Sequence, residues 1–148
     1  MKSQINYNTI LEITVSLEQI SNVANRIISY LPNSAIVALN GDLAAGKTTL
    51  VSSIVQILNL GQVVSSPTFS LQNTYSNKLF HYDFYRLNYS EIMQLGLIDE
   101  LEKDGLHFIE WAPKELIALL ENAGFEIFII DIEKVDNSRK YKLKVLNA

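Results

Sequence analysis

A complete phosphate-binding motif lies in the first third of the chain. It fits the pattern G-x-x-x-x-G-K-[ST] at each fixed position. Its residues are, in order, Gly41, Asp42, Leu43, Ala44, Ala45, Gly46, Lys47 and Thr48. In a loop of this kind the glycines let successive backbone N–H groups face phosphate oxygens, the lysine reaches the β- and γ-phosphates, and the threonine hydroxyl binds Mg²⁺. The motif therefore predicts a site for a nucleoside triphosphate with Mg²⁺.

Two acidic residues are candidates for the chemistry that would follow binding. Asp83 ends the run 79–83, and Glu110 ends the apolar run 106–110. Phosphoryl chemistry needs a carboxylate near the metal at the end of a strand, and a group that orients the attacking water or hydroxyl. The spacing alone does not rank the two acids, and either one taken singly could be a solvated or capping residue. Beside a phosphate loop, both become candidates for metal chemistry.

Two histidines lie in the same runs. Period-two alternation places His81 on the same strand face as Asp83. A lone histidine in a strand is more often a hydrogen-bonded packing residue than a catalyst. We therefore interpret His81 and His107 as structural residues.

The phosphate loop requires a strand before it and a helix after it. Residues 35–39 are a short, entirely apolar run, which is typical of a strand buried on both faces. Apolar residues recur at helical spacing after the loop; they are Leu50, Val51, Ile54, Val55 and Leu58. The loop is thus expected to open a helix, whose N-terminus favours phosphate.

The rest of the chain predicts further strands and helices. Strands are expected at 10–15, 69–75, 78–84, 106–109, 125–133 and 140–146. Helices are expected between Ser16 and Pro32, at 90–97, at 99–104 and from Pro113 onward. Ser76-Asn77 is expected to form a tight hairpin turn. Early strand–helix alternation followed by hairpins favours a mixed sheet over a parallel one. We expect one domain, residues 1–148, with an α/β P-loop NTPase-like fold and a mixed central β-sheet flanked by helices.

Composition restricts the class of protein. The 148 residues are 48% hydrophobic, enough for a core, and include no cysteine, which excludes disulfides, thiolate metal sites and cysteine nucleophiles. The formal net charge of −4 has the wrong sign for a protein that grips a nucleic acid backbone by itself, so any role with RNA should go through a partner. Neither a signal peptide nor a membrane-spanning run is recognisable, and a soluble, cytoplasmic protein is expected.

Four sequence blocks follow one another along the chain. They are the phosphate loop continued by Thr49, then Val64-x-Ser66-Pro67-Thr68-Phe69, then His81-x-Asp83-x-Tyr85-Arg86-Leu87, and finally Ile109-Glu110-Trp111. In this order they closely resemble the TsaE (YjeE) family of small bacterial ATPases, and together they are far more specific than the loop alone. The resemblance implies an ATPase that acts with the TsaD and TsaB proteins in threonylcarbamoyladenosine modification of tRNA, and that meets tRNA only indirectly.

The resemblance also implies which residues bind ATP and Mg²⁺. Lys47 and the amides of the phosphate loop would hold the ATP phosphates, with Thr49 at the end of the motif. Thr48 and Glu110 would serve Mg²⁺. Trp111 would lie beside the nucleotide.

Hydrolysis is assigned by the same resemblance. Asp83 would support it, and Thr68 would lie in a switch-like loop, so that Asp83, Glu110 and Thr68 are the catalytic candidates. One residue departs from the family pattern, because Ala44 stands where the family usually has glycine. If that position needs a positive φ, an L-residue there costs about 1 kcal/mol or more.

A small-molecule kinase is the strongest alternative enzyme. A self-sufficient kinase needs cationic groups around the transition state, and the chain has only Arg26, Arg86 and Arg139. Of these, only Arg86 lies near a motif, which counts against a kinase. The Asn-Lys-x-Asp element of GTPases is absent from the sequence.

A nucleotide-gated, non-catalytic regulatory module is the second alternative. Residues 91–104 interleave acidic and apolar residues, which favours two amphipathic helices with a solvated acidic face over a docking surface. Lys140, Lys142 and Lys144 alternate with apolar residues, which is typical of a charged edge strand. A basic patch for tRNA is the less favoured interpretation of these lysines.

Overall fold

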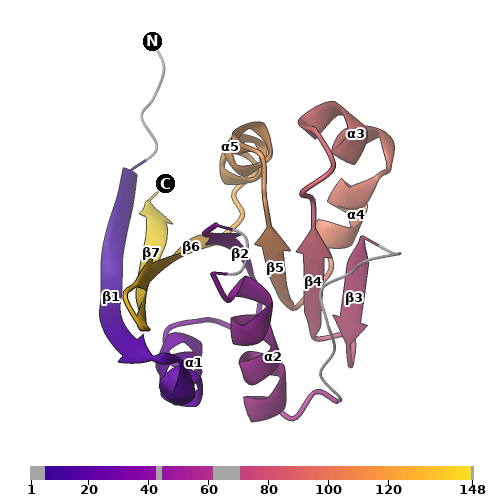
Figure 1. Cartoon of the computed structure of the whole chain (residues 1–148). Coiled ribbons are helices and arrows are strands. Elements are labelled where there is room, and N and C mark those ends of the chain that lie inside the picture. The colour runs from indigo at the N-terminus through magenta and orange to yellow at the C-terminus, as the bar shows by residue number, and fades with distance from the viewer. Residues whose placement is uncertain (1–5, 43–44, 62–70, 148) are drawn as a thin grey trace.

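A single β-sheet organises the protein (Figure 1). The computed structural model describes residues 6–42, 45–61 and 71–147. Its sheet has seven strands in the order β1-β7-β6-β2-β5-β4-β3. The strands are β1 (Asn6–Ser16), β2 (Ala35–Asn40), β3 (Gln72–Tyr75), β4 (Leu79–Asp83), β5 (Leu106–Glu110), β6 (Ile127–Val135) and β7 (Ser138–Asn147). Within these ranges, no helix is both long and apolar enough to cross a bilayer.

The sheet is mixed, as the sequence predicts. Strands β6, β2, β5 and β4 are parallel neighbours, with β2 between β6 and β5. At one side β3 is antiparallel to β4, and at the other β7 is antiparallel to both β6 and β1. The carboxyl ends of the parallel strands therefore meet at one edge, which is where open α/β sheets bind ligands.

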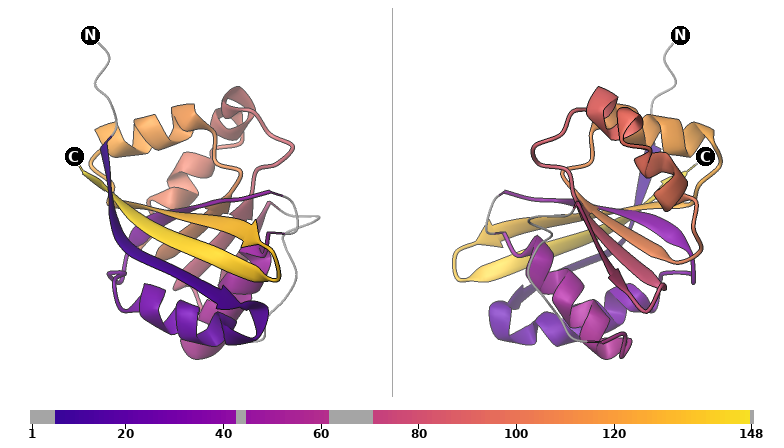
Figure 2. Two further views of the ribbon diagram at one scale, coloured as in Figure 1. Left: turned by 60° about the vertical axis from the view of Figure 1, so that its left-hand side comes forward. Right: turned by 90° about the vertical axis from the view of Figure 1, so that its right-hand side faces the viewer.

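Helices cover both faces of the sheet (Figures 1 and 2). On one face lie α1 (Ile20–Ile28) and α2 (Lys47–Ile57), and on the other lie α3 (Tyr89–Gln94), α4 (Leu97–Leu101) and α5 (Lys114–Asn122). Alternate residues of β2 divide the core, because Val37 and Leu39 pack with α1 and α2 whereas Ile36 and Ala38 pack with α3 to α5. The predicted α/β fold with a mixed, helix-flanked sheet is thus confirmed.

Some helix boundaries differ from the predicted ones. A single 3₁₀ turn, η1 (Leu17–Gln19), precedes α1. Helix α1 then ends at Ile28 instead of continuing to Leu31, and its last turn closes with i→i+3 hydrogen bonds. Helix α4 begins at Leu97, earlier than predicted, directly after Gly96, whose φ of +71° separates it from α3.

The hairpin predicted around Ser76-Asn77 is confirmed. It joins β3 to β4, and Ser76 and Asn77 have φ values of 53° and 52°. Positive φ at both central residues is the mark of a type I′ turn, whose twist matches that of the strands it joins. Residues 69–70, the start of the strand predicted at 69–75, lie outside the described residues.

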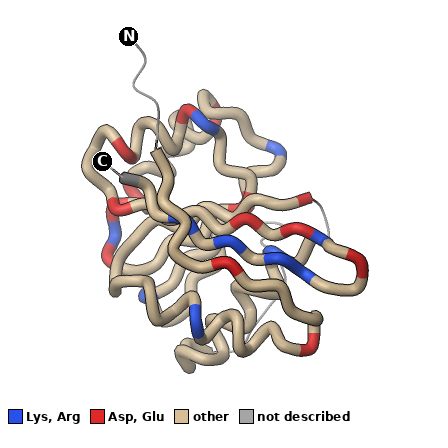
Figure 3. The backbone as a smooth tube through the Cα atoms, turned by 90° about the vertical axis from the view of Figure 1, so that its left-hand side faces the viewer, with Lys and Arg blue, Asp and Glu red and all other residues tan. Residues whose placement is uncertain are grey.

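The prediction that Lys140, Lys142 and Lys144 lie on an edge strand is wrong. Strand β7 is paired on both sides, with β6 and with β1. Lys140 Nζ lies 2.9 Å from Glu12 Oε1, and Lys144 Nζ lies 2.6 Å from Asp131 Oδ2. Basic and acidic residues interleave along these three strands (Figure 3). Cross-strand charge pairing therefore explains the lysines, since alternation reports one solvated face and not the position of a strand in its sheet.

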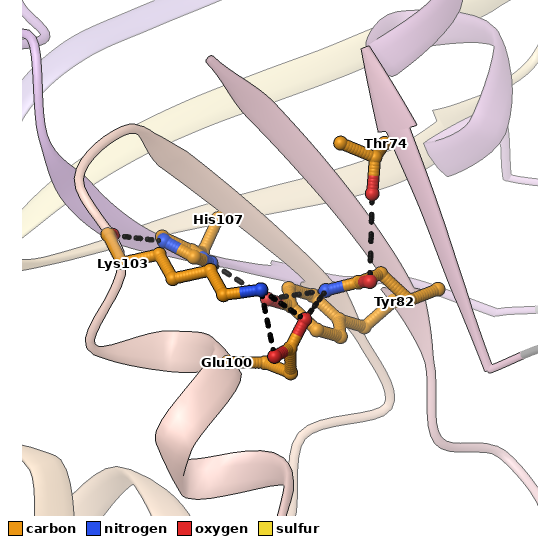
Figure 4. A network of polar contacts seen from close by, with 6 residues as sticks. Thr74, Tyr82, Glu100, Lys103 and His107 are labelled. Atoms are coloured by element: carbon orange, nitrogen blue, oxygen red, sulfur yellow. Dashed lines mark hydrogen bonds and ion pairs between the residues drawn. The ribbon is translucent and has the colours of Figure 1, made fainter. Parts of the chain in front are cut away.

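A network of polar side chains links α4 to the sheet (Figure 4). The Tyr82 hydroxyl lies 2.7 Å from His107 Nδ1, and His107 Nε2 lies 2.7 Å from the backbone oxygen of Lys103. A carbonyl only accepts, so Nε2 carries the ring proton and Tyr82 donates to Nδ1. Gln72 Nε2 donates to the Tyr82 hydroxyl and to Glu100 Oε1. Burial lowers the pKa of His107, which favours this neutral, hydrogen-bonded packing role.

Two buried tyrosines should respond differently to loss of the hydroxyl. Tyr82→Phe removes the hydrogen bond to buried His107 Nδ1 and one of the hydrogen bonds of Gln72, and should lower the free energy of unfolding by about 1–3 kcal/mol. Tyr141 is 1% exposed, and its hydroxyl has no hydrogen-bond partner among the described residues. Tyr141→Phe should therefore leave the free energy of unfolding unchanged or raise it by about 1 kcal/mol. Urea unfolding of both variants measures the difference, and an equal loss in the two would contradict this account.

Candidate active site

The phosphate loop connects β2 to α2 at the carboxyl edge of the sheet, as predicted. Helix α2 begins at Lys47, and Gly46 precedes it at a φ of +107°, a conformation that glycine adopts without the cost of a Cβ atom. Ala45 is buried, and its N–H donates to the Asp42 oxygen over 3.0 Å, which closes a turn in the loop. Residues 43–44 lie outside the described residues, so the conformation of the loop at that point stays a prediction.

Lys47 lies in the interior of the site. Lys47 is 5% exposed, and its Nζ donates a hydrogen bond of 2.6 Å to the backbone oxygen of Gly41. Nζ also lies 3.8 Å from the centroid of the Trp111 ring, which is a cation–π contact. Burial lowers the pKa of Lys47, and three nearby carboxylates, led by that of Glu110, oppose this effect. The predicted phosphate lysine thus stands at the N-terminus of α2 between the loop and an aromatic ring.

Glu110, at the end of β5, contacts the phosphate loop directly. Thr48 Oγ1 donates to Glu110 Oε2 over 3.0 Å, and His81 Nε2 lies 2.6 Å from the same oxygen. Strand β5 is the neighbour of β2, and its register pairs Glu110 with Leu39, near the start of the loop. Sheet topology therefore joins Thr48 to a residue 62 positions away. This contact distinguishes Glu110 from Asp83, which spacing alone does not rank.

The positions of Thr48 and Glu110 suit a Mg²⁺ ion. An octahedral Mg²⁺ with ligands at about 2.0–2.1 Å has neighbouring ligand oxygens about 3 Å apart. The two oxygens here are 3.0 Å apart. Mg²⁺ is commonly bound by one or two protein groups together with substrate phosphates and water. No group of three or more His, Cys, Asp or Glu that could hold a metal occurs in the described part of the chain.

Asp83 lies at the end of β4, opposite Glu110 in the register of the sheet. Its Oδ1 accepts a hydrogen bond of 3.0 Å from the Tyr85 N–H. The Tyr85 ring packs edge-on against Trp111, with the centroids 4.9 Å apart. Trp111 has a φ of +61°, which is uncommon for a residue other than glycine and often marks a functional turn. Tyr85, which follows β4, thus packs against Trp111, which follows β5 and contacts Lys47.

Two residues outside the predicted set contact the site. His81, interpreted from the sequence as structural, is 1% exposed and bonds to Glu110; the strand face that it shares with Asp83 is the signal that points to it. Arg139 Nε donates to the Ala45 oxygen over 3.2 Å. This contact corrects the expectation that Arg86 is the only arginine near a motif. The sequence does not reveal Arg139, because 94 residues separate it from Ala45 and no local pattern marks it.

Thr49 and Thr68 are the remaining predicted residues. Thr49 is exposed in the first turn of α2. Thr68 lies outside the described residues, so its position in a switch-like loop stays a prediction.

Comparison with known families decides the relationship of the chain. A family model described as "Threonylcarbamoyl adenosine biosynthesis protein TsaE" matches residues 14–141, which include the phosphate loop, both candidate carboxylates and Arg139. The chain belongs to the TsaE family. The resemblance that the four sequence blocks indicate is thereby confirmed, and the role of the TsaE family is in threonylcarbamoyladenosine biosynthesis.

Several relatives of this chain carry the name "tRNA threonylcarbamoyladenosine biosynthesis protein TsaE". The relative from Haemophilus influenzae is 34% identical over 118 residues, which are 77% of this chain and 72% of that protein. The relative from Rickettsia felis is 37% identical over 136 residues, 88% of this chain and 77% of that protein. The Bacillus subtilis relative is 32% identical over 102 residues, 67% of this chain, and the match spans 64% of that relative's length.

The fold of this chain is also found in a solved structure. The crystal structure of Bacillus subtilis YdiB superposes with a TM-score of 0.67 and covers 99% of this chain and 90% of its own. The two sequences are 23% identical, so this similarity is evidence for a shared fold alone.

Proposed function

We propose that this TsaE protein binds ATP with Mg²⁺, hydrolyses it slowly, and acts with TsaD and TsaB in threonylcarbamoyladenosine modification of tRNA. The observation that carries the ATPase part is the contact of Thr48 with Glu110 beside Lys47. A phosphate-loop hydroxyl, a strand-end carboxylate and a lysine are the groups that phosphate-loop enzymes use. The names of the relatives support the pathway, and the net charge of −4 supports contact with tRNA through the partners. We also propose that residues 1–148 form one domain.

Binding in this proposal depends on the loop and the residues packed against it. Lys47 Nζ would exchange the Gly41 oxygen for the β- and γ-phosphates, with the Trp111 ring shielding one side of the ammonium. Thr48 and Glu110 would hold Mg²⁺, which when bound adds positive charge beside the phosphate oxygens. The bond from His81 would keep Glu110 directed at Thr48, as groups around a metal site commonly orient its ligands.

Hydrolysis requires a group that orients the attacking water. Asp83 is the candidate, because its carboxylate lies at the same edge of the sheet as Glu110, one strand further along. A carboxylate can accept several hydrogen bonds, so the one from Tyr85 leaves capacity for water. Thr68, in the predicted switch-like loop, is the third catalytic candidate.

The arrangement of cationic groups supports slow and partner-dependent turnover. An arginine that stabilises the transition state raises phosphate-loop hydrolysis by about 10³–10⁵-fold. Arg139, which lies beside the loop, is bonded to the backbone oxygens of Ala45 and Ser138. We therefore expect the transition state to lack a full set of cations until a partner contributes to the site.

The isolated chain should hydrolyse ATP on the order of 10⁻³ s⁻¹ or more slowly, as phosphate-loop proteins do without a supplied arginine. Addition of TsaD and TsaB should raise the rate at least about tenfold. Phosphate release by the purified chain, with and without these proteins, measures both rates, and Lys47→Ala is the matched control for contaminating ATPases. Rapid turnover with a small metabolite as phosphate acceptor would favour a kinase instead. Binding of ATP without hydrolysis under any of these conditions would favour a nucleotide-gated module.

A further inference from the structure

The β6–β7 hairpin forms a wall beside the phosphate loop. Strand β6 pairs with β2 as far as Asp131, opposite Asn40 at the end of β2, and then continues to Val135, where the chain turns back into β7. The hairpin therefore extends beyond the end of β2 (Figure 2). A Cβ atom on Gly41 would lie 2.8 Å from the Ile132 oxygen, so the first loop residue is in close contact with the hairpin.

Arg139 reaches from this hairpin to the loop. Its Nε donates to the Ala45 oxygen, and its Nη1 donates to the Ser138 oxygen, both over 3.2 Å. Hydrogen bonds from a cation are stronger than those between neutral groups, and a guanidinium stays charged at any ordinary pH. Ala45 is 2% exposed, so loss of a partner for its carbonyl would be costly. The contact thus fixes the orientation of the peptide group between Ala45 and Gly46.

The orientation of this peptide group decides which atom the loop presents to a ligand. None of the described residues has a cis peptide bond. In a trans peptide the C=O and the N–H point in opposite directions. An Ala45 oxygen bonded to Arg139 therefore directs the Gly46 N–H away from the hairpin. Phosphate loops bind their ligands with backbone N–H groups of this kind.

We propose that Arg139 is a positioning residue of the phosphate loop, which holds the Ala45–Gly46 peptide so that the Gly46 N–H faces a nucleotide phosphate. The proposal rests on the nucleotide binding proposed above. The ligand class is a nucleoside di- or triphosphate, since the loop is built to hold the phosphates beyond the first. Arg139 acts on the nucleotide through the backbone of the loop. A residue that only stabilises the hairpin would not change how the Gly46 amide responds to a nucleotide.

Calorimetric titration with ADP and ATP tests the effect on affinity. Arg139→Met keeps the aliphatic stem and removes the donors, and should weaken binding of both nucleotides at least about tenfold. Lys134 pairs with Arg139 across the hairpin and is exposed, so Lys134→Met is the matched control and should stay within about twofold of the wild type. Arg139→Lys keeps a charge and a donor, and should give an intermediate affinity.

The Gly46 amide resonance tests the mechanism. Saturating ADP should shift this resonance in the wild type and in Lys134→Met. The shift should be lost in Arg139→Met and reduced in Arg139→Lys. If Arg139→Met does not fold, Arg139→Lys still tests the mechanism. A wild-type Gly46 shift in these Arg139 variants, or an equal loss of affinity in Lys134→Met, would overturn the proposal. Failure of the wild-type chain itself to bind ADP and ATP would instead contradict the proposed nucleotide binding, so the two failures are distinguishable.

Discussion

Lys47→Ala should raise the dissociation constant for ATP at least about 100-fold, which corresponds to about 2.7 kcal/mol. Lys47 is the side chain that the loop motif assigns to the β- and γ-phosphates, and it stands at the N-terminus of α2. Its ammonium is held among carboxylates, so its removal leaves the acidic groups of the site unopposed when a polyphosphate arrives. Isothermal titration calorimetry with ATP in excess Mg²⁺ measures the change.

A matched lysine variant separates this effect from a general loss of charge. Lys78 is exposed in the β3–β4 turn, at the opposite end of β4 from the site, and Lys78→Ala should leave ATP affinity within about twofold. The melting temperature of Lys47→Ala should stay close to that of the wild type, because burial already disfavours the charged lysine. ATP affinity in Lys47→Ala that matches the wild type would exclude the proposed phosphate site.

Glu110→Ala and Asp83→Ala should each lower ATP turnover at least about 100-fold while changing ATP affinity by less than about tenfold. Glu110 contacts Thr48, the proposed Mg²⁺ ligand, and Asp83 lies next to Glu110 at the sheet edge, so in the proposed reaction both carboxylates act where charge develops. The phosphate groups still meet Lys47 and the loop amides in both variants, which preserves most of the binding energy. Single-turnover phosphate release and calorimetry on the same samples separate the two quantities.

Glu102 supplies the control for these acidic substitutions. It is exposed at the C-terminal end of α4, and Glu102→Ala removes the same charge while leaving the site untouched. Chelation of Mg²⁺ should reduce turnover of the wild type to the level of Glu110→Ala. Wild-type turnover in either Glu110→Ala or Asp83→Ala would remove that residue from the mechanism, and loss of binding equal to the loss of turnover would make it a binding group only.

Local patterns are sufficient to predict the elements around the site. The apolar run 35–39 forms β2, and the residues with helical apolar spacing after the loop form α2. Both elements can be predicted because a continuous apolar run and a helical period are visible in neighbouring residues. The turn at Ser76-Asn77 and the break at Gly96 are local for the same reason. The TsaE resemblance also rests on short blocks, and it assigns Glu110 to Mg²⁺ before any distance is known.

Contacts between distant segments depend on strand order and register, which no local pattern encodes. Spacing alone leaves Asp83 and Glu110 equivalent, whereas the pairing of β2 with β5 puts Glu110 within 3.0 Å of Thr48. The pairing of β4 with β5 likewise turns His81 from an apparent packing residue into a partner of Glu110.

The phosphate loop, the α/β elements and the family can thus be predicted from the sequence, because each is recognised from short blocks of neighbouring residues. The tertiary structure alone decided that β7 is an internal strand and that Arg139 on it reaches the Ala45 carbonyl. The physical reason is that β7 is placed by its pairing with β6 and β1, and the hairpin is long enough to pass the end of β2. A residue 94 positions from the loop is therefore one of its direct neighbours.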